Sequence, residues 1–235
     1  MEKNKTIKIL GIIPARSGSK RLPGKNIRLF LEKPIISYTI KAAKQSRCFQ
    51  RLLVSTNCKK TAAISRKCQA DVRMRPSALA LDSASVADVC KFILEQDDIR
   101  QEQFDMVCVL YATSPLRGPK DIRSVVNLVK YKGHSSAMAV TTFGYPINQA
   151  LSKHRKKILP VFPKIFKKNA KDLPKYFVDN GSTYAVRTDY FLSRHSFFSP
   201  DLAVHVMPRI RSVDIDTWED FFTAETTARA LKKHP

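Results

Sequence analysis

Two groups of charged residues, far apart in the chain, have types and spacings that suit chemistry on a phosphate. The first lies in IIPARSGSKRLPGKN, residues 12–26, where four cations share a loop with two glycines and two prolines. These cations are Arg16, Lys20, Arg21 and Lys25. The second group is the pair Asp214 and Asp216. Cationic side chains and glycine backbone bind phosphate oxygens, and carboxylates are ligands that Mg²⁺ prefers. The two groups therefore predict a nucleotide-phosphate site with a magnesium ion.

The 12–26 loop differs from two common phosphate-binding sequences. The dinucleotide fingerprint GxGxxG needs glycines that this stretch lacks. A Walker loop would need glycine at Ser19 and a hydroxyl residue at Asn26, and would open a helix there, whereas helical spacing begins only near Pro34. We therefore expect a long loop that wraps a triphosphate from the side. The alternative, a basic surface loop without a ligand, would order four cations with no anion to offset the lost entropy.

The two aspartates belong to VDID, residues 213–216, which we predict to be a short strand. Residues i and i+2 of a strand point to the same side, so both carboxylates would face one metal ion. We expect this metal site at the open edge of the sheet, opposite the cationic loop. The alternative is an acidic strand end that caps a helix beginning at Thr217. The nearby cations favour the metal site.

The elements that would position these groups alternate between strands and helices. The run IKILGII, residues 7–13, is apolar throughout, as expected of a strand buried on both faces. Further strands are predicted at 51–56, 70–75, 105–113, 135–143, 182–187 and 203–208, and helices at 35–45, 59–69, 83–96, 119–132 and 218–233. This alternation predicts an α/β fold with a Rossmann-like, mostly parallel sheet. The cationic loop would then lie at the carboxyl ends of the strands, where such sheets bind ligands.

Residues 146–180 interrupt this pattern. They contain four prolines, and between Lys153 and Lys175 there are nine Lys or Arg residues against Asp172. We interpret residues 1–235 as one catalytic domain and 146–180 as an inserted arm that forms a homodimer and directs basic side chains toward an acidic substrate. A flexible basic loop remains the alternative.

The composition limits the possible partners and location. The chain has 42 Lys and Arg against 20 Asp and Glu, a formal charge of +22. This excess attracts polyanions: nucleic acid, anionic lipid or a nucleotide triphosphate. No segment reaches the roughly 20 apolar residues that span a bilayer. Five cysteines without a CxxC pair predict a reduced, cytoplasmic protein without a zinc site.

Several motifs resemble those of the acylneuraminate cytidylyltransferases, which make CMP-activated nine-carbon acidic sugars. The similarity covers nearly the whole chain and places the motifs in the same order. They are RSGSKRLPGKN at 16–26, RPSALALDSAS at 75–85, ATSPLR at 112–117, DNGSTY at 179–184 and DIDT at 214–217. The resemblance implies a nucleotide-diphospho-sugar transferase (GT-A-like) fold and transfer of CMP from CTP.

The same resemblance implies roles for individual residues. For the nucleotide, it implies phosphate contacts from Arg16, Ser19, Lys20 and Lys25, and further contacts from Asn26, Arg75 and Ser85. For the sugar, it implies contacts from Tyr111, Thr113, Asn180 and Tyr184. Asp214 and Asp216 would bind Mg²⁺, and these two with Arg16 and Lys25 would form the catalytic set.

The identity of the acceptor sugar stays open in the sequence. Tyr111-Ala112 replaces the Gln-Pro pair common in the family, and FGYPI at 143–147 resembles the branch that activates pseudaminic acid. Asn180-Gly181, by contrast, resembles the sialic acid type. Two alternatives remain: a cytidylyltransferase for the eight-carbon sugar Kdo, whose loop also contains RLPGK, and a basic nucleic-acid-binding protein. The chain lacks the interleaved aromatic and basic residues of single-strand binders, which weakens the second alternative.

Overall fold

A computed structural model describes residues 6–233 and is built around one seven-stranded sheet. Across the sheet the strands run in the order β11-β7-β10-β6-β1-β4-β5. Their bounds are β1 Ile9–Pro14, β4 Arg51–Thr56, β5 Asp71–Met74, β6 Met106–Leu110, β7 Ser136–Thr142, β10 Phe177–Arg187 and β11 Ala203–Val206. All neighbours pair in parallel except β10, which is antiparallel to both β6 and β7. The predicted α/β, Rossmann-like and mostly parallel architecture is confirmed.

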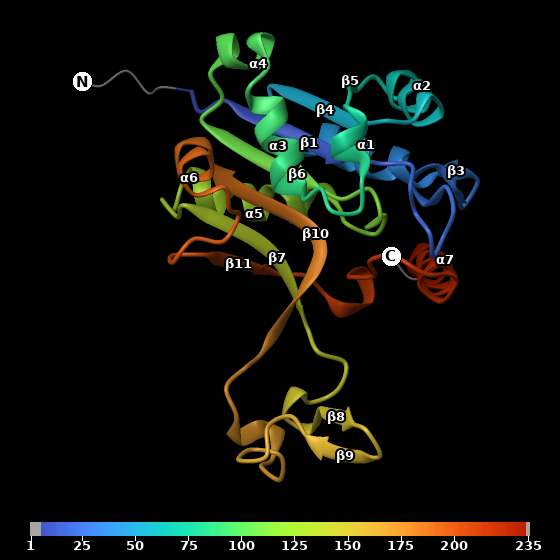
Figure 1. Ribbon diagram of the computed structural model, residues 1–235, viewed down its shortest axis with the longest axis vertical. Helices are drawn as coiled ribbons and strands as arrows, with labels where there is room; N and C mark the ends of the chain where they lie inside the picture. The colour runs from blue at the N-terminus through green and yellow to red at the C-terminus, as the bar shows by residue number, and fades with distance from the viewer. Residues whose placement is uncertain (1–5, 234–235) are drawn as a thin grey trace.

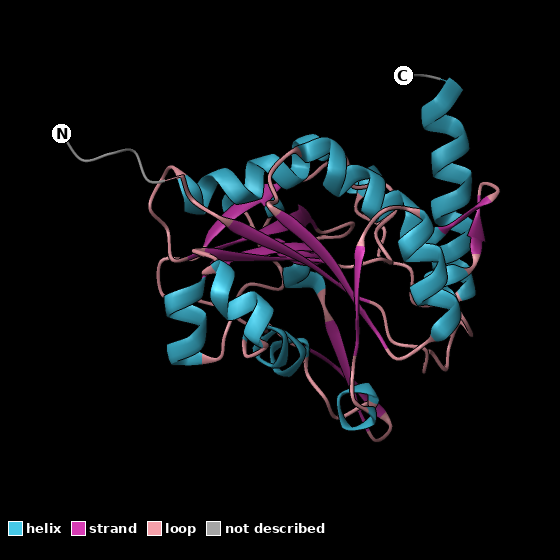
Figure 2. Cartoon of the chain, turned by 90° about the horizontal axis from the view of Figure 1, so that it is seen from above, coloured by secondary structure: helices cyan, strands magenta, loops and turns pink. Residues whose placement is uncertain are grey.

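Helices cover both faces of the sheet (Figures 1 and 2). On one face, Ile9 and Ile13 of β1 join a core with α1 (Ile35–Ser46) and α5 (Pro119–Lys130). On the other face, Leu10 and Ile12 join a core with α3 (Val86–Leu94), α4 (Asp97–Glu102) and α6 (Thr188–Arg194). Alternate residues of β1 thus face opposite cores, as the period of a strand requires. The remaining helix of this region is α2 (Lys59–Lys67), between β4 and β5.

A third apolar cluster lies under the cationic loop and ties it to the C-terminal part of the chain. Leu22 of the loop and Ile215 are both 0% exposed and pack with residues of α7 (Trp218–Lys233). Phe30, in a small hairpin of β2 (Leu29–Phe30) and β3 (Lys33–Pro34), completes this cluster with Ile35. Because Ile215 stands between Asp214 and Asp216, burial of its side chain holds both aspartates beside the loop.

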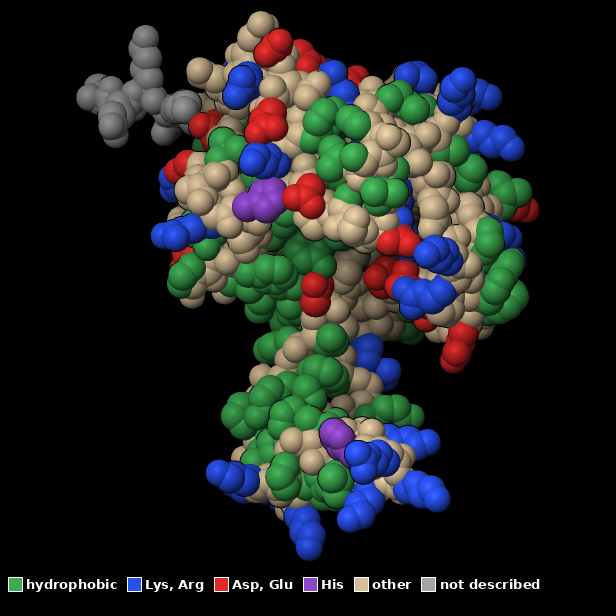
Figure 3. All heavy atoms as spheres, in the orientation of Figure 1, with side chains coloured by type: hydrophobic (Ala, Val, Ile, Leu, Met, Phe, Trp, Pro, Cys, Tyr) green, Lys and Arg blue, Asp and Glu red, His purple; other side chains and the backbone are tan. Residues whose placement is uncertain are grey.

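The arm, residues 146–180, projects from the body where β7 ends and β10 begins (Figure 1). Its main element is a hairpin of β8 (Leu151–His154) and β9 (Lys157–Pro160). Lys and Arg side chains ring the arm in Figure 3, and hydrophobic side chains gather between them. Ile158 and Leu159 are 57% and 47% exposed.

The structure corrects three local expectations. Residues 213–216 form no strand, because this segment runs beside the cationic loop without a partner in the sheet. Two helices were missed: α4, which is only six residues long, and α6, whose sequence TDYFLSR has no clear apolar period. Finally, β10 begins at Phe177, so the Asn180-Gly181 motif lies within a strand, at an irregularity in its pairing with β7. No helix among residues 6–233 is long and apolar enough to cross a membrane.

Candidate active site

A cavity of about 380 Å³ opens at the carboxyl ends of β1 and β6. After β5 the chain crosses to the other side of β1 to form β6, so the cavity lies where the strand order reverses, the usual ligand position in such sheets. Ten of the predicted site residues line it: Arg16, Ser19, Lys20, Lys25, Asn26, Arg75, Ser85, Tyr111, Thr113 and Asp216. Positions taken from four separate motifs, together with Tyr111, therefore converge on one cavity.

Two cations of the loop are held by Asp82, a residue for which the sequence predicts no role. Asp82 Oδ1 lies 2.6 Å from Arg16 Nη2, and its Oδ2 lies 2.8 Å from Lys20 Nζ. The hydrogen bonds from Lys20 and Arg16 lower the pKa of Asp82 below its ordinary value. A carboxylate thus occupies the cations that the resemblance assigns to the phosphates of CTP. The only sequence signal for this contact was the position of Asp82 within the 75–85 motif.

The other two cations of the loop contact Asp216. Arg21 pairs with Asp216 Oδ2, and Lys25 pairs with Oδ1. Lys25 also donates to the carbonyl of Ile215 at 3.3 Å. These contacts bring the loop and the second charged group together, as predicted. They also lower the pKa of Asp216 against the opposing effect of burial.

Asn26 and Arg75 line the inner part of the cavity, and each is only 8% exposed. Asn26 donates to the carbonyl of Arg16 at 2.8 Å, which fixes the start of the cationic loop. Arg75 donates to the carbonyl of Ser55 at 2.7 Å, but its Nε has no partner among the described residues. Burial lowers the pKa of Arg75 to about 10. A buried guanidinium with an unused donor is suited to hold an anionic or carbonyl group of a ligand.

Ser85 lies at the N-terminus of α3, where it forms a capping box with Asp88. Its hydroxyl lies 2.7 Å from Asp88 Oδ2, and Asp88 Oδ1 lies 2.9 Å from His195 Nε2. Hydrogen bonds from Ser85 and then from His195 lower the pKa of Asp88 to about 2. His195 is therefore structural: it links α3 to the loop that follows α6.

Asp214 is set deeper than Asp216, against Thr113 and Gly181. Gly181 has φ +61°, and a β-carbon there would lie 2.5 Å from Asp214 Oδ2. Burial raises the pKa of Asp214 to about 6; a hydrogen bond from Thr113 opposes this effect, and the charge of Asp216 adds to it. Its Oδ1 is buried without a hydrogen-bond partner among the described residues.

That unpartnered oxygen bears on the predicted magnesium ion. A buried carboxylate oxygen without a donor costs free energy unless a cation or a proton satisfies it. Mg²⁺ commonly takes one or two protein carboxylates and completes its shell with water and substrate phosphates. Asp214 fits this requirement. Asp216 fits it once the phosphates of a nucleotide draw Arg21 and Lys25 away. In the described part of the chain, no cluster of three or more His, Cys, Asp or Glu side chains offers a metal site made by the protein alone.

A second cavity of about 200 Å³ adjoins the first through Tyr111 and Val86, which line both. Tyr184 lies at its wall and donates from its hydroxyl to Asp179 Oδ2 at 2.6 Å. Burial and then this hydrogen bond raise the pKa of Tyr184. Burial likewise raises the pKa of Tyr111 to about 12, so both phenols stay neutral donors. Sequence reasoning missed two further aromatic walls, Phe197 and Phe198, because they follow α6 in a loop without a motif.

Asn180 is placed differently from the other predicted sugar contacts. Its side chain is buried, and its amide lies 3.2 Å from both the sulfur of Met207 and the hydroxyl of Ser212. It lines neither of the two cavities described above. Its contact with a sugar stays a prediction. In this structure Asn180 anchors the segment that leads to Asp214.

The comparison with protein families accounts for this arrangement. A family model described as "Cytidylyltransferase" matches residues 10–180, from β1 into β10. This range includes the cationic loop, Arg75, Ser85 and Tyr111. The chain belongs to the cytidylyltransferase family. It is therefore a nucleotidyltransferase.

Two curated relatives of this cytidylyltransferase match it over nearly their whole length, and a third is longer. It is 34% identical to the pseudaminic acid cytidylyltransferase of Campylobacter jejuni, over 91% of this chain and 93% of that protein. It is 35% identical to the CMP-N,N'-diacetyllegionaminic acid synthase of Legionella pneumophila, over 93% and 95%. With the N-acylneuraminate cytidylyltransferase of Escherichia coli, a longer protein, it shares 30% identity, over 93% of this chain and 52% of that protein.

Two solved structures share the fold of this cytidylyltransferase. The first is CMP:2-keto-3-deoxy-manno-octonic acid synthetase in complex with CTP, with a TM-score of 0.71 and 16% identity over 95% of this chain and 99% of that one. The second is 4-diphosphocytidyl-2C-methyl-D-erythritol synthase from Anaerococcus prevotii, with a TM-score of 0.65 and 12% identity over 95% and 96%. At these identities the likeness concerns the fold alone.

Proposed function

We propose that this cytidylyltransferase transfers CMP from CTP to the anomeric hydroxyl of a nine-carbon nonulosonic acid and releases pyrophosphate. One observation carries the proposal: a cation-lined cavity adjoins an aromatic one, and Tyr111 lines both. A nucleotide in the first cavity would present its α-phosphate toward a sugar in the second. The curated relatives named above act on three different nonulosonic acids, which supports this substrate class.

The cations of the loop would hold the triphosphate and stabilise the charge on the leaving pyrophosphate. Arg16 and Lys20 exchange the carboxylate of Asp82 for phosphate oxygens, and Lys25 stays close to the reacting phosphate through its contact with the Ile215 carbonyl. Phosphoryl transfer requires positioning and charge neutralisation more than covalent chemistry from the protein. The sugar oxygen forms the new bond to the α-phosphorus while the bond to pyrophosphate breaks, and the hydroxyl proton passes to solvent water.

Binding of the sugar would fall to the aromatic cavity. Tyr111 and Tyr184 offer neutral hydroxyls, and Asp179 offers a carboxylate that can accept from sugar hydroxyls. Phe197 and Phe198 give an apolar wall suited to the acyl groups that such sugars carry on nitrogen. Stacked or apolar contact with part of the sugar, and polar contact with the rest, is how such cavities select a ligand.

A magnesium ion fits the carboxylates of Asp214 and Asp216. When bound, it would neutralise negative charge on the phosphate that reacts. Asp214 would contribute an oxygen that has no other partner in the described structure, and Asp216 would contribute one that becomes free when the phosphates draw Arg21 and Lys25 away.

The arm, residues 146–180, would form the interface with a second copy of the chain. Its exposed aliphatic residues, among them Ile158 and Leu159, have no cover in the monomer. Nine cations with one nearby acid suit the acidic substrate of a facing subunit. The homodimer therefore buries the apolar side of each arm and directs basic residues toward the sugar carboxylate.

Pyrophosphate release across a panel of substrates tests this function. The panel contains CTP, ATP, GTP and UTP, each with nine-carbon nonulosonic acids and with the eight-carbon acid Kdo. We expect turnover with CTP and a nine-carbon acid. Equal turnover with other nucleotides would refute specificity for cytosine. Faster turnover with Kdo than with the nine-carbon acids would show that the chain is a Kdo cytidylyltransferase. Tight, salt-sensitive binding to duplex DNA without any turnover would favour the nucleic-acid alternative.

A further inference from the structure

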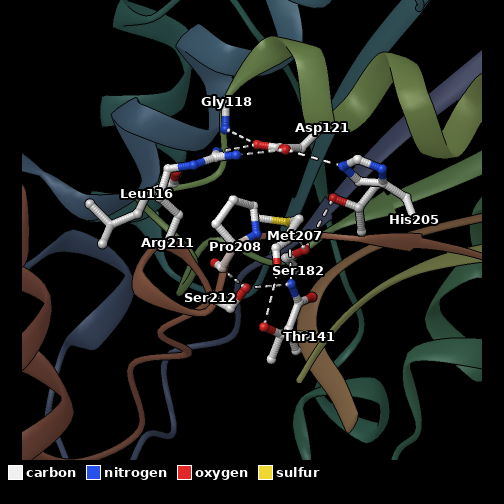
Figure 4. Close-up of polar contacts among 12 residues, drawn as sticks. Leu116, Gly118, Asp121, Thr141, Ser182, His205, Met207, Pro208, Arg211 and Ser212 are labelled. Atoms are coloured by element: carbon white, nitrogen blue, oxygen red, sulfur yellow. Dashed lines mark hydrogen bonds and ion pairs between the residues drawn. The ribbon is translucent and has the colours of Figure 1, made fainter. Parts of the chain in front are cut away.

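A buried ion pair lies behind the active site, outside both cavities. Asp121, in the first turn of α5, is 3% exposed. Arg211 reaches it with two nitrogens: Nη1 contacts Oδ2, and Nη2 contacts Oδ1 at 3.1 Å. Figure 4 shows Asp121 between Arg211 on one side and His205 of β11 on the other. His205 Nε2 lies 3.2 Å from Asp121 Oδ1.

Asp121 also closes the N-terminus of its own helix. Its Oδ2 accepts a hydrogen bond of 2.8 Å from the backbone N–H of Gly118. Burial alone would raise the pKa of Asp121, but the hydrogen bonds from His205, Arg211 and Gly118 hold it below its usual range. The carboxylate is therefore charged, fixed to a helix, and matched by a two-pronged guanidinium, which is the most directional of the common ion pairs.

Arg211 belongs to the segment that carries the predicted metal ligands. Residues 207–216 leave β11 and reach Asp214 and Asp216 without joining the sheet. Discrete contacts hold the two ends: Met207 donates to the Val140 carbonyl at 2.8 Å, and Ile215 donates to the Thr113 carbonyl at 3.0 Å. Between them, the Ser212 hydroxyl accepts from Asn180 at 3.2 Å.

These contacts differ in strength. The bond from Asn180 to Ser212 is neutral, whereas the Arg211–Asp121 contact is ionic, bidentate and buried at its carboxylate. A charge-assisted bidentate contact is roughly twice as strong as a neutral hydrogen bond. Because Asp214 follows Arg211 by three residues, a displacement of Arg211 would also displace Asp214 relative to Thr113 and Gly181.

We propose that Asp121 is a positioning residue for the metal site: through Arg211 it holds the 207–216 segment so that the Asp214 carboxylate stays in place. Asp121 touches neither cavity, and its effect passes through Arg211, with His205 as a second donor that keeps the carboxylate oriented. The inference rests on the proposed function for the identity of the metal site. It extends that function to a residue 93 positions away in the chain from Asp214.

The test measures metal binding without turnover. Mn²⁺ binding to the protein with CTP, but without sugar, is followed by electron paramagnetic resonance in Asp121→Asn, Asp121→Glu and Arg211→Lys variants. Residues that orient metal ligands typically change metal affinity by about 10- to 100-fold when replaced. We expect Asp121→Asn to weaken Mn²⁺ binding by about 10-fold or more. Asp121→Glu and Arg211→Lys, which keep both charges, should lose less.

Asp98→Asn serves as the control. Asp98 also pairs with two arginines, Arg51 at the start of β4 and Arg73 in β5, but it lines neither cavity. We expect this variant to bind Mn²⁺ as the wild-type protein does, even if its melting temperature falls.

Hydrogen exchange gives a second readout that depends on neither metal nor substrate. Amides of residues 209–216 should exchange faster in Asp121→Asn than in Asp98→Asn. Normal Mn²⁺ affinity and normal exchange in folded Asp121→Asn would overturn the proposal, as would an equal loss in Asp98→Asn. If Asp121→Asn does not fold, normal values in Arg211→Lys would overturn it. None of these results depends on which sugar is the acceptor, so failure here and failure of the proposed function are distinguishable.

Discussion

The backbone of Gly181 lies directly against the carboxylate of Asp214, so that a β-carbon at position 181 would meet Asp214 Oδ2 at 2.5 Å. Real side chains do not approach a β-carbon so closely, and the facing atoms belong to a short, partly buried side chain that cannot swing far. The positive φ of Gly181 adds a second reason for glycine at this position. Gly181, in the DNG motif of β10, thus leaves room for the carboxylate of Asp214, the predicted metal ligand, because glycine has no side chain.

Gly181→Ala should damage both the fold and the reaction. The positive φ costs roughly 1–2 kcal/mol for a residue with a β-carbon, and displacement of Asp214 adds a loss of kcat. Gly133→Ala is the matched control, because Gly133 also has a positive φ, +75°, but a β-carbon there would meet no atom within 4 Å. We expect similar strain in both variants and a loss of kcat only in Gly181→Ala. Equal kcat values in the two would show that the contact with Asp214 has no role.

Asp214→Asn should separate catalysis from stability. We expect kcat to fall by roughly two to four orders of magnitude, since about 3–5 kcal/mol of transition-state stabilisation is lost. Burial raises the pKa of Asp214 to about 6, so the folded protein disfavours the ionised form. Ionisation of Asp214 therefore lowers the free energy of unfolding of the wild type. This loss is absent below about pH 4, grows as the pH rises toward 6 and is complete above about pH 6.

Melting curves at several pH values check the second part of this prediction. The melting temperature of Asp214→Asn, relative to wild type, should rise between about pH 4 and pH 6 and then stay constant, because only the wild type ionises there. Mn²⁺ affinity of the wild type should fall as pH drops below about 6, where Asp214 takes up a proton. A kcat near that of wild type, with unchanged Mg²⁺ dependence, would place the metal elsewhere.

Asp82→Asn should tighten the binding of CTP. Asp82 occupies Arg16 and Lys20, and its side chain is 52% exposed, so the contact is screened by water and easily exchanged. Removal of this competing anion should lower KM for CTP by about two- to five-fold. Asp71→Asn changes net charge by the same amount, and Asp71 is 55% exposed where it pairs with Arg51, far from the cavity. A higher KM in Asp82→Asn than in Asp71→Asn would instead make Asp82 a supporting contact for the loop.

Light scattering should find a dimer whose formation needs the arm. Ile158→Asp places a charge among the exposed aliphatic residues of β9, and we expect it to yield monomers at micromolar concentration. Leu192→Asp, on α6, is the control, because Leu192 is 56% exposed and Ile158 is 57% exposed. A wild-type monomer at working concentration would exclude the dimer, and equal effects of the two variants would exclude the arm as its interface.

The elements of the sheet were predictable because their residues carry a local signal. Val107 and Val109 of β6 belong to an apolar run that can be read without knowledge of the rest of the chain. The convergence of Arg16, Arg75 and Tyr111 followed from topology, since parallel strands end at the same edge.

Other features depend on contacts between segments that are distant in the chain. Such contacts leave no periodic pattern of apolar residues in a single sequence. Ile215 appeared to continue a strand, yet its burial comes from α7 and the cationic loop, which hold residues 213–216 outside the sheet. The pairing of Asp82 with Arg16 and the wall formed by Phe197 also arise from loops that meet only in the folded chain.

The most direct test of the proposed transfer supplies both substrates, the nucleotide and the sugar, and measures both products of one reaction. The protein is incubated with Mg²⁺, CTP and one nine-carbon nonulosonic acid at a time, and mass spectrometry quantifies CMP-sugar and pyrophosphate together. We expect the two products in equal amounts with at least one such acid, and neither product when CTP or the acid is left out. Pyrophosphate released from CTP without an acceptor, or no CMP-sugar with any nonulosonic acid of the panel, would contradict the proposed transfer.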